Sequence, residues 1–433
     1  KKNKVFYFLS YERSTERQSA QRYLDVPTAA MRQGDLSGSP TPIYDPLSGA
    51  PFNPQKPNAY ARDRVPFPNN QIPESRFSGP TKRILALPDW PLPNAPGQGA
   101  LGINLNYLAQ INYQYNRNQI DSKVNFNLTS KWTAFARLSY LDYGTRNPPP
   151  FGRLGGLNIH PTDIRPGRGF GHVYSGTLSP TYVASPSLVF DGYFGVMLLD
   201  TNALFPNMDE NIGRDLLGIP GTNGTTSFAG GMPRMLIDGF SLLGNSNISP
   251  FFGHDYQFQY VVNGNWARGS HDLRFGTDIY QSHLNQGVAN AAGAVGGPSG
   301  GFMFRTATTG RRGGPATNDY HGFASFLLGL AREAGRNVLS TPVYKVRSPS
   351  YSLYVRDRWQ LNPRVTFSYG LRWEYYPFPT RPHRGLERYD FDTNEVMLCG
   401  LGSIPRNCGL DQSKRLFAPR IGVAWRLTGS FVV

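Results

Sequence analysis

Segments in which apolar and polar residues alternate recur along the whole chain, and this period of two constrains the fold more than any other feature. The segment KVNFNLTSKWTAFARLSY shows it best, because Val124, Phe126 and Leu128 share one face while Lys123 and Asn125 share the other. Successive residues of a strand point to opposite faces of a sheet. The alternation resumes after a short break, which is typical of a β-hairpin.

The same alternation returns near 255–281, 351–376 and 416–427. One face of these segments is apolar, whereas the other carries Arg and Glu and cannot form the core of a β-sandwich. We therefore expect one face to meet lipid and the other to face inward. The lipid-facing set is predicted to include Phe126, Leu138, Phe258, Phe367 and Trp425. The inward set is predicted to include Asn125, Arg137, Gln259, Ser368 and Arg426.

Connection lengths also alternate. Short breaks near 129–131, 181–186, 269–271 and 362–363 separate long connections at 13–112, 145–168, 201–253, 287–349 and 378–415. Short turns at one end and long extracellular loops at the other are typical of outer-membrane barrels. We predict an all-β fold, an antiparallel transmembrane outer-membrane β-barrel of which the chain holds a part, about ten strands, with every strand pair antiparallel.

Composition is consistent with this prediction. The mean hydropathy of −0.41 and the absence of a long apolar run exclude a transmembrane helix. A transmembrane strand needs only about ten alternating residues. Aromatic residues make up 13% of the chain and are predicted to form two interfacial girdles, although ordinary sheet aromatics are the alternative. The girdle candidates are Trp132, Tyr140, Trp266, Trp359, Trp373 and Tyr375.

One helix is predicted within the long connections. Thr317 or Asn318 is a suitable N-cap for the segment TNDYHGFASFLLGLARE, and apolar residues follow at helical spacing. These apolar residues are Phe323, Phe326, Leu327 and Leu330. We expect the helix to pack against neighbouring loops.

The formal net charge is +15, but the basic residues are scattered and form no long run, so nucleic acid is not an expected partner. They are expected instead to attract anionic solutes and lipopolysaccharide phosphates. Several polar-face residues can line a lumen, where they either contact a small ligand or pair with one another or with a plug, and pairing is favoured. These candidates are Arg137, Gln257, Gln259, Arg274, Arg356, Arg358, Arg372 and Glu374.

No motif indicates catalysis or a cofactor. The seven histidines include no pair at metal-ligand spacing, the Gly-rich stretches lack a GK[ST] ending, and no G-x-S-x-G elbow occurs. We expect no metal site, no cofactor and no enzymatic activity. Cys399 and Cys408 are predicted to form a disulfide in the loop 378–415, with two free thiols as the alternative.

Six strings, in order along the chain, resemble the Oar-like TonB-dependent receptors, a family of large outer-membrane proteins. They are VPTAAMRQGDLSG (26–38), IYDPLSGAPF (43–52), NNQIPESRFSGPTKRILALPDWPLPN (69–94), FASFLLGL (323–330), YSLYVRDRWQLNPRVTFSYGLRWEYY (351–376) and LFAPRIGVAWRLTG (416–429). The resemblance implies energy-coupled uptake of a nutrient, such as a glycan, a peptide or a siderophore-like ligand, across the outer membrane. A surface adhesion or envelope-organising protein and a passive pore are the alternatives.

The family also implies a barrel of about 22 strands with an internal plug. Residues 1–433 are expected to be part of the barrel domain, its N-terminal half, without the N-terminal regulatory-like domain, the plug or the TonB box. The expected partners are outer-membrane lipid and lipopolysaccharide, an unknown small ligand, and the TonB complex through the missing plug region.

Overall fold

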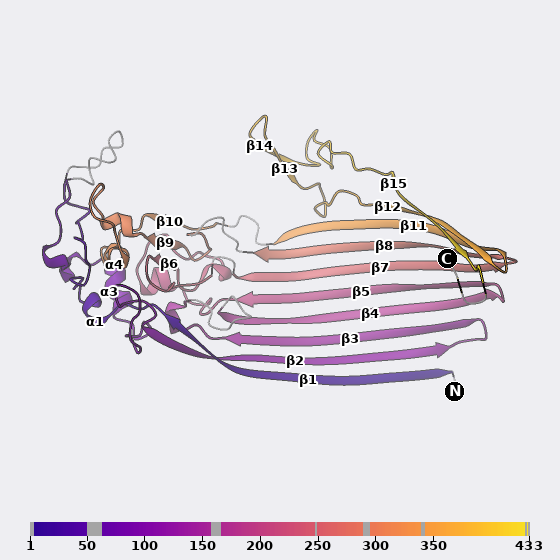
Figure 1. Cartoon of the computed structure of the whole chain (residues 1–433), viewed down its shortest axis with the longest axis horizontal. Helices are drawn as coiled ribbons and strands as arrows, with labels where there is room; N and C mark the ends of the chain where they lie inside the picture. The colour runs from indigo at the N-terminus through magenta and orange to yellow at the C-terminus, as the bar shows by residue number, and fades with distance from the viewer. Residues whose placement is uncertain are drawn as a thin grey trace.

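Ten long strands form one antiparallel sheet in which neighbours in space follow the order of the chain. The computed structural model describes residues 4–49, 63–156, 166–246, 249–288, 295–338, 343–428 and 431. In spatial order the strands are β1 (Val5–Leu24), β2 (Tyr107–Asn127), β3 (Trp132–Asn147), β4 (Gly167–Ser185), β5 (Leu188–Leu204), β7 (Phe251–Arg268), β8 (His271–Val288), β11 (Tyr344–Asn362), β12 (Val365–Tyr375) and β15 (Leu416–Trp425). The sheet is an open, curved wall, as Figure 1 shows.

Short and long connections lie at opposite ends of this wall. The connections 128–131, 186–187, 269–270 and 363–364 are tight turns at one end, and all others are long excursions at the other (Figure 1). This is the predicted alternation. Among the described residues, no helix is long and apolar enough to cross a membrane.

Strand register places the apolar residues on a single face across the whole sheet. Because paired residues point to the same side, each cross-strand row belongs to one face. One such row runs through Tyr7, Val124, Ala136, Leu178, Phe194, Tyr260, Ile279, Tyr351 and Tyr375. The predicted lipid-facing residues all lie on this face, and Asn125, Arg137, Gln259 and Ser368 lie on the other, so the prediction is confirmed for these residues. Arg426 follows the end of β15.

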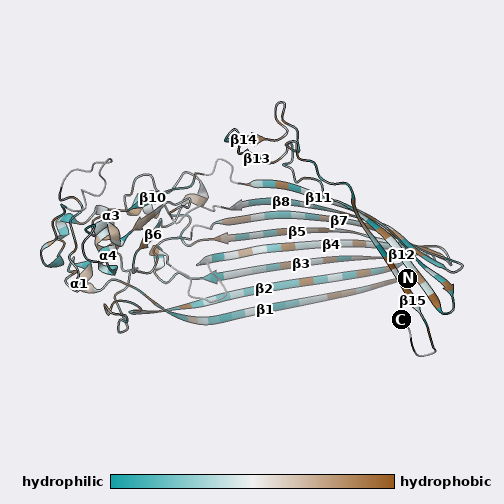
Figure 2. Ribbon diagram, turned by 45° about the horizontal axis from the view of Figure 1, so that its top comes forward, coloured by the Kyte–Doolittle hydropathy of each residue, from teal (hydrophilic) through white to brown (hydrophobic). Residues whose placement is uncertain are grey.

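The apolar face forms a band bounded by aromatic residues. On β3 the band runs from Trp132 to Tyr140, which is nine residues, and a tilted transmembrane strand needs about 9–11 residues to cross the apolar core of a bilayer. Trp132 stacks on Tyr182 with ring centroids 4.4 Å apart, and Tyr140 contacts Tyr174 at 4.9 Å. Figure 2 shows hydrophobic colours on β12 and β15 and hydrophilic colours along much of β1 and β2.

β1 and β2 extend farther than the connection 13–112 expected from the sequence. β1 continues to Leu24 and β2 begins at Tyr107, so the first connection is shorter. Just beyond the apolar band both faces of these strands carry polar residues, as in the pairs Arg13 with Asn118 and Ser14 with Arg117. The hydropathy alternation therefore disappears while the backbone ladder continues.

Asp357 is an unexpected polar residue on the apolar face. The carboxylate is only 4% exposed, and it accepts hydrogen bonds from Tyr369 at 2.7 Å and lies 2.6 Å from Nδ1 of His271. His271 also stacks on Trp359 with centroids 5.4 Å apart. Both partners engage Oδ2 and offset part of the cost of a carboxylate at a lipid-facing position, whereas Oδ1 is buried without a hydrogen-bond partner among the described residues.

The described parts of the connections 25–106, 148–166, 205–250 and 289–343 fold together into one module, which we call the cap (Figure 1). Its helical elements are α1 (Ala29–Arg32), η1 (Pro68–Asn70), η2 (Glu74–Arg76), α3 (Gly79–Leu85), η3 (Gly152–Leu154), η4 (Ile212–Leu216), η5 (Ser227–Ala229), η6 (Thr306–Thr309) and α4 (Asp319–Leu327). Its strands are β6 (Arg234–Ile237), β9 (Gly301–Phe304) and β10 (Glu333–Gly335).

An aromatic cluster from three connections holds the cap together. Phe326 contacts Trp90 at 5.6 Å and Phe304 at 5.4 Å, and Phe323 contacts Phe240 at 5.3 Å between ring centroids. The predicted helix is confirmed as α4, capped by Asn318 and buried in this cluster. β6 pairs in parallel with β9, so the expectation that every strand pair is antiparallel is wrong for the cap and holds for the ten-stranded sheet.

The fifth long connection, 376–415, stands apart from the cap (Figure 1). It contains the hairpin of β13 (Glu387–Asp390) and β14 (Glu395–Leu398). Its base is tied to the sheet through backbone hydrogen bonds between Arg347 and Thr380.

Two adjacent valines on β7 test the assignment of faces. Val262 is 55% exposed on the apolar face, whereas Val261 points to the polar face and pairs with Asp278. We expect Val262→Arg to destabilise the folded protein by about 2–4 kcal/mol, because it places a charge in lipid, and Val261→Arg to cost far less. Urea unfolding of the full-length protein in vesicles measures both. Equal costs, or the reverse order, would contradict the assignment.

Candidate functional site

The polar face of the sheet is the inward wall of the molecule. At the end of the sheet with the long connections, this face carries three residues that belong to the buried core of the cap: Leu24 on β1 and Ala109 and Ile111 on β2. The cap is therefore anchored on the polar face and covers its end.

Arginines gather on the part of this wall formed by β8, β11, β12 and β15. Arg274 is the direct cross-strand partner of Arg356, and Gly370 separates Arg356 from Arg420 in the same row. Arg358 and Arg372 occupy the rows on either side. Five guanidinium groups thus project from four adjacent strands.

Among the described residues, Arg372 is the one arginine of this group that forms an ion pair. Arg372 donates to Glu374 at 2.7 Å and to Ser352 at 3.0 Å. In the described part of the chain, the side chains of Arg274, Arg356, Arg358 and Arg420 make no ion pair with a carboxylate. Arg358 lies directly opposite Asp272 in the sheet, so the charges without a carboxylate neighbour in their row are those of Arg274, Arg356 and Arg420.

A shallow cavity of about 530 Å³ lies among the arginines. Gly370 is among its lining residues, and a side chain does not fit there without a shift, since a Cβ would come within 2.8 Å of the Val355 carbonyl oxygen. The polar lining residues include Arg274, Tyr354, Arg356, Ser368, Arg372 and Arg420. Guanidinium groups stay charged at any physiological pH and bind carboxylate or phosphate in a bidentate manner. Like charges directly opposite each other destabilise a sheet, so this row favours an anionic occupant.

The other predicted residues share the wall but not the cavity. Arg137 forms an ion pair with Asp121 at 2.9 Å, and Gln259 donates to Asp278 at 3.0 Å. Gln257 pairs with Ser282 across the strands. β3 is four strand positions from β8, about 19 Å at the usual spacing. The eight candidates therefore lie on one face without forming one site, and pairing occurs for Arg137, Arg372 and Glu374.

Sequence reasoning left three polar cavity residues, Tyr354, Ser368 and Arg420, out of the candidate site, although it placed Ser368 on the inward face. Arg420 and Tyr354 both lie on the polar parity of alternating segments, which was the signal that could have found them. Tyr354 donates to Asn263 at 2.8 Å, which fixes the ring beside the arginines. Their convergence depends on register between strands far apart in the chain.

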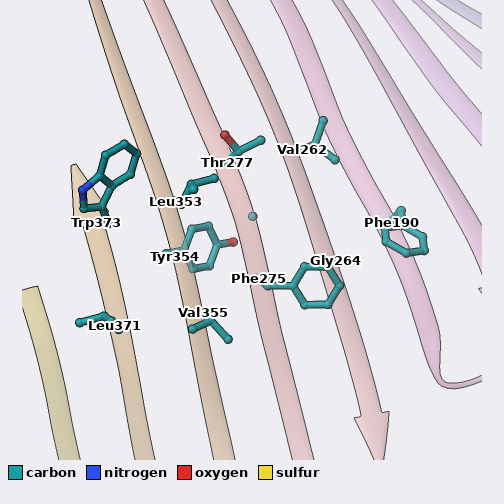
Figure 3. A pocket seen from close by; sticks show the side chains of 11 residues that line it. Phe190, Val262, Gly264, Phe275, Thr277, Leu353, Tyr354, Val355, Leu371 and Trp373 are labelled. Atoms are coloured by element: carbon teal, nitrogen blue, oxygen red, sulfur yellow. The ribbon is translucent and has the colours of Figure 1, made fainter. Parts of the chain in front are cut away.

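A second cavity, of about 480 Å³, opens on the apolar face (Figure 3). Phe190, Val262, Phe275, Leu353 and Trp373 line it. The ring of Phe275 lies against Gly264, where a side chain would collide with it at 2.4 Å. The groove is apolar and faces outward, so it suits a lipid acyl chain rather than a solute.

Within the described ranges, no three His, Cys, Asp or Glu side chains come close enough to hold a metal ion. His160 lies outside the described residues.

His321 is a buried titratable residue of the cap. Its side chain is 1% exposed, and both ring nitrogens face hydroxyls, Thr41 at 3.0 Å and Thr309 at 3.2 Å. Burial lowers the pKa of His321 to about 4, although its hydrogen bond with Thr309 opposes the shift. The imidazole is therefore neutral at pH 7 and links α4 to two other cap segments.

The separate connection 376–415 is stabilised by charge and by a covalent bond. Burial raises the pKa of Glu387, but hydrogen bonds from Arg384 and Arg381 outweigh it and lower the pKa to about 2. In the structure Cys399 and Cys408 are bonded, with Cα atoms 5.1 Å apart. Both cysteines are buried within their loop.

A family model described as "Outer membrane beta barrel domain" matches residues 1–433. The chain belongs to this family and is an outer-membrane protein of a Gram-negative bacterium. No curated protein sequence matches it significantly.

Several solved outer-membrane proteins are similar in structure. The ferripyoverdine receptor of Pseudomonas aeruginosa is 11% identical with a TM-score of 0.38, and the match covers 74% of this chain and 36% of the receptor. The outer membrane transporter YddB from Escherichia coli is 11% identical with a TM-score of 0.39, and the match covers 77% of this chain and 32% of the transporter. The ferric-catecholate import receptor Fiu from E. coli K12 is 10% identical with a TM-score of 0.32, and the match covers 74% of this chain and 44% of the receptor. The chain thus spans less than half the length of these proteins.

The titration of His321 predicts a pH dependence of cap stability. The unfolded chain binds a proton near pH 6.5 and the folded cap only near pH 4, so stability is full above pH 6.5 and falls as the pH drops toward 4. The loss is on the order of 3 kcal/mol. Limited proteolysis of the cap in urea at pH 7.5 and pH 4.5 measures it. His321→Gln should remove most of the dependence and His383→Gln, an exposed control, should not.

The bond between Cys399 and Cys408 has a direct chemical test. Alkylating the unreduced full-length protein and weighing the peptide around Gly400–Asn407 should show no alkyl groups on the pair. Reduction before alkylation should add two. Two groups without reduction would show that the thiols are free. The closed loop is short, so loss of the bond is expected to cost about 2–3 kcal/mol locally.

Proposed function

We propose that the chain is part of an Oar-like TonB-dependent receptor that imports a nutrient across the outer membrane. The observation that carries the proposal is an inward wall with uncompensated arginines beneath a folded cap. Membership of the outer-membrane barrel family and the six sequence strings support it. Energy would come through TonB, by way of a plug region elsewhere in the parent protein.

The long connections face the cell exterior in this proposal. The cap would meet the ligand first, and the arginine wall would then contact it inside the barrel. Arg274, Arg356 and Arg420 favour a glycan, peptide or siderophore-like ligand that carries carboxylate or phosphate groups. The role is transport, with no enzymatic step, cofactor or nucleic acid.

Paired substitutions test the role of the wall. We expect Arg274→Gln with Arg356→Gln in the full-length gene to reduce uptake of the ligand about tenfold or more, because two charge-assisted contacts are lost. Lys123→Gln with Arg137→Gln is the matched control, since it removes the same charge from the same face on β2 and β3. An equal loss of uptake in both double variants would argue against a specific role of Arg274 and Arg356 in ligand binding.

Uptake by cells carrying the full-length gene, compared with a deletion strain, tests the function itself. Candidate glycans, peptides and ferric siderophores are supplied in turn, with and without a working TonB complex. Import is expected only with both the gene and TonB. Uptake that ignores TonB would indicate a passive pore, and a deletion that alters only surface attachment would indicate an adhesion protein. Sequencing the parent gene for a plug and a TonB box is an inexpensive complement.

A further inference from the structure

Four arginines project from the outward face of β1–β4, above the apolar band. Arg17, Arg146 and Arg168 lie in one cross-strand row, with Gln114 of β2 between the first two. Arg13 lies lower on β1, where it pairs with Asn118. Each arginine is an even number of residues from the lipid-facing residues of its strand, so these side chains point away from the inward wall.

Strand register also shows how far these arginines lie from the apolar band, on the side of the long connections. Tyr11, Tyr140 and Tyr174 share a row at the upper limit of the apolar band. Arg13 lies two residues and Arg17 six residues beyond Tyr11 on the same strand. With a rise of about 3.3 Å per residue and a strand tilt of about 40°, these positions are about 5 Å and about 15 Å above the tyrosines. That layer holds the headgroups of the lipids whose chains meet the band.

Acidic partners for these arginines are missing from the same surface. Two outward carboxylates lie in the cross-strand row of Arg13, and both have other partners. Asp142 lies 3.3 Å from His172 and accepts a hydrogen bond from Asn118 at 3.3 Å, and Asp200 accepts one from Asn202 at 3.1 Å. Within the described residues, the side chains of Arg13, Arg146 and Arg168 form no hydrogen bond or ion pair. Arg17 donates only to neutral groups, the Glu16 and Tyr115 carbonyls and the Asn116 side chain.

Arg146 and Arg168 are direct cross-strand partners, and both are exposed. Two cations opposite each other repel, and no carboxylate of the described residues forms an ion pair with either side chain to offset the repulsion. Gly144 leaves space below Arg146 on the same face, since a Cβ there would meet only the Gly169 carbonyl oxygen, at 3.9 Å. A phosphate between the two guanidinium groups would turn the repulsion into two charge-assisted contacts.

We propose that Arg13, Arg17, Arg146 and Arg168 bind the phosphate groups of the outer-leaflet glycolipid. The patch continues directly into the exposed apolar surface of the same strands, where Leu138 and Leu178 are 66% and 51% exposed and can hold acyl chains. A free phosphate has no use for such a surface, whereas a phosphorylated lipid uses both parts. Like the proposed function, this inference places the long connections at the cell exterior, but it does not depend on transport.

Lipid titration of the full-length protein in detergent tests this inference. Native mass spectrometry follows the fraction of protein that carries one molecule of diphosphorylated lipid A, dephosphorylated lipid A or neither. We expect diphosphorylated lipid A to bind most tightly and Arg146→Gln with Arg168→Gln to weaken it about tenfold or more. The same pair should leave binding of dephosphorylated lipid A unchanged.

Arg268→Gln with Arg364→Gln is the matched control, because it removes two charges at the opposite end of the sheet. Binding by this control should equal that of the wild type. Equal weakening in both pairs would indicate a bulk charge effect and overturn the inference, as would equal binding of the two lipids. Displacement of lipid A by inorganic phosphate at the same concentration would assign the patch to a free anion instead. Circular dichroism confirms that each variant is folded, and a defect in nutrient uptake has no bearing on these outcomes.

Discussion

Backbone hydrogen bonding between strands is the constraint on which the rest of the molecule depends. In lipid no water is available to pair with an N–H or C=O group, so the chain must satisfy both within its own sheet. A shift of one residue between any two strands would send every side chain of the shifted strand to the other face. The unbroken apolar row from Tyr7 to Tyr375 shows that register is kept across nine strands.

Once register is set, the two faces follow different rules. The outward face accepts a carboxylate only where partners are built in, as His271 and Tyr369 are for Asp357. The inward face tolerates uncompensated charge, as Arg274 beside Arg356 shows. Above the apolar band the outward face becomes polar again, and Arg146 beside Arg168 repeats the arrangement there. Both arginine pairs follow from strand register, and both suit anions, a solute inside and a lipid headgroup outside.

The cap depends on the sheet in another way. Its core combines Trp90, Phe240 and Phe323 from connections that are far apart in the chain. Antiparallel strands return each long connection to the same end of the sheet, so these segments meet without a linker of their own. Burial of the aromatic cluster and of neutral His321 then holds them together. The presence of a folded cap at this end of the sheet is thus a consequence of strand topology.

The sequence by itself determined the elements whose signal is local. Alternation defined the strands and their faces, helical spacing after Asn318 defined α4, and turn lengths defined the order of short and long connections. It did not extend β1 to Leu24, because polar residues on both faces carry no alternation. Nor did it bring Arg420 to Arg274, or Arg168 to Arg146, because which residues lie opposite one another is decided by hydrogen bonds between strands. Only the tertiary structure decided that two sets of scattered arginines form patches and that the loops build a cap, since both depend on contacts between distant parts of the chain.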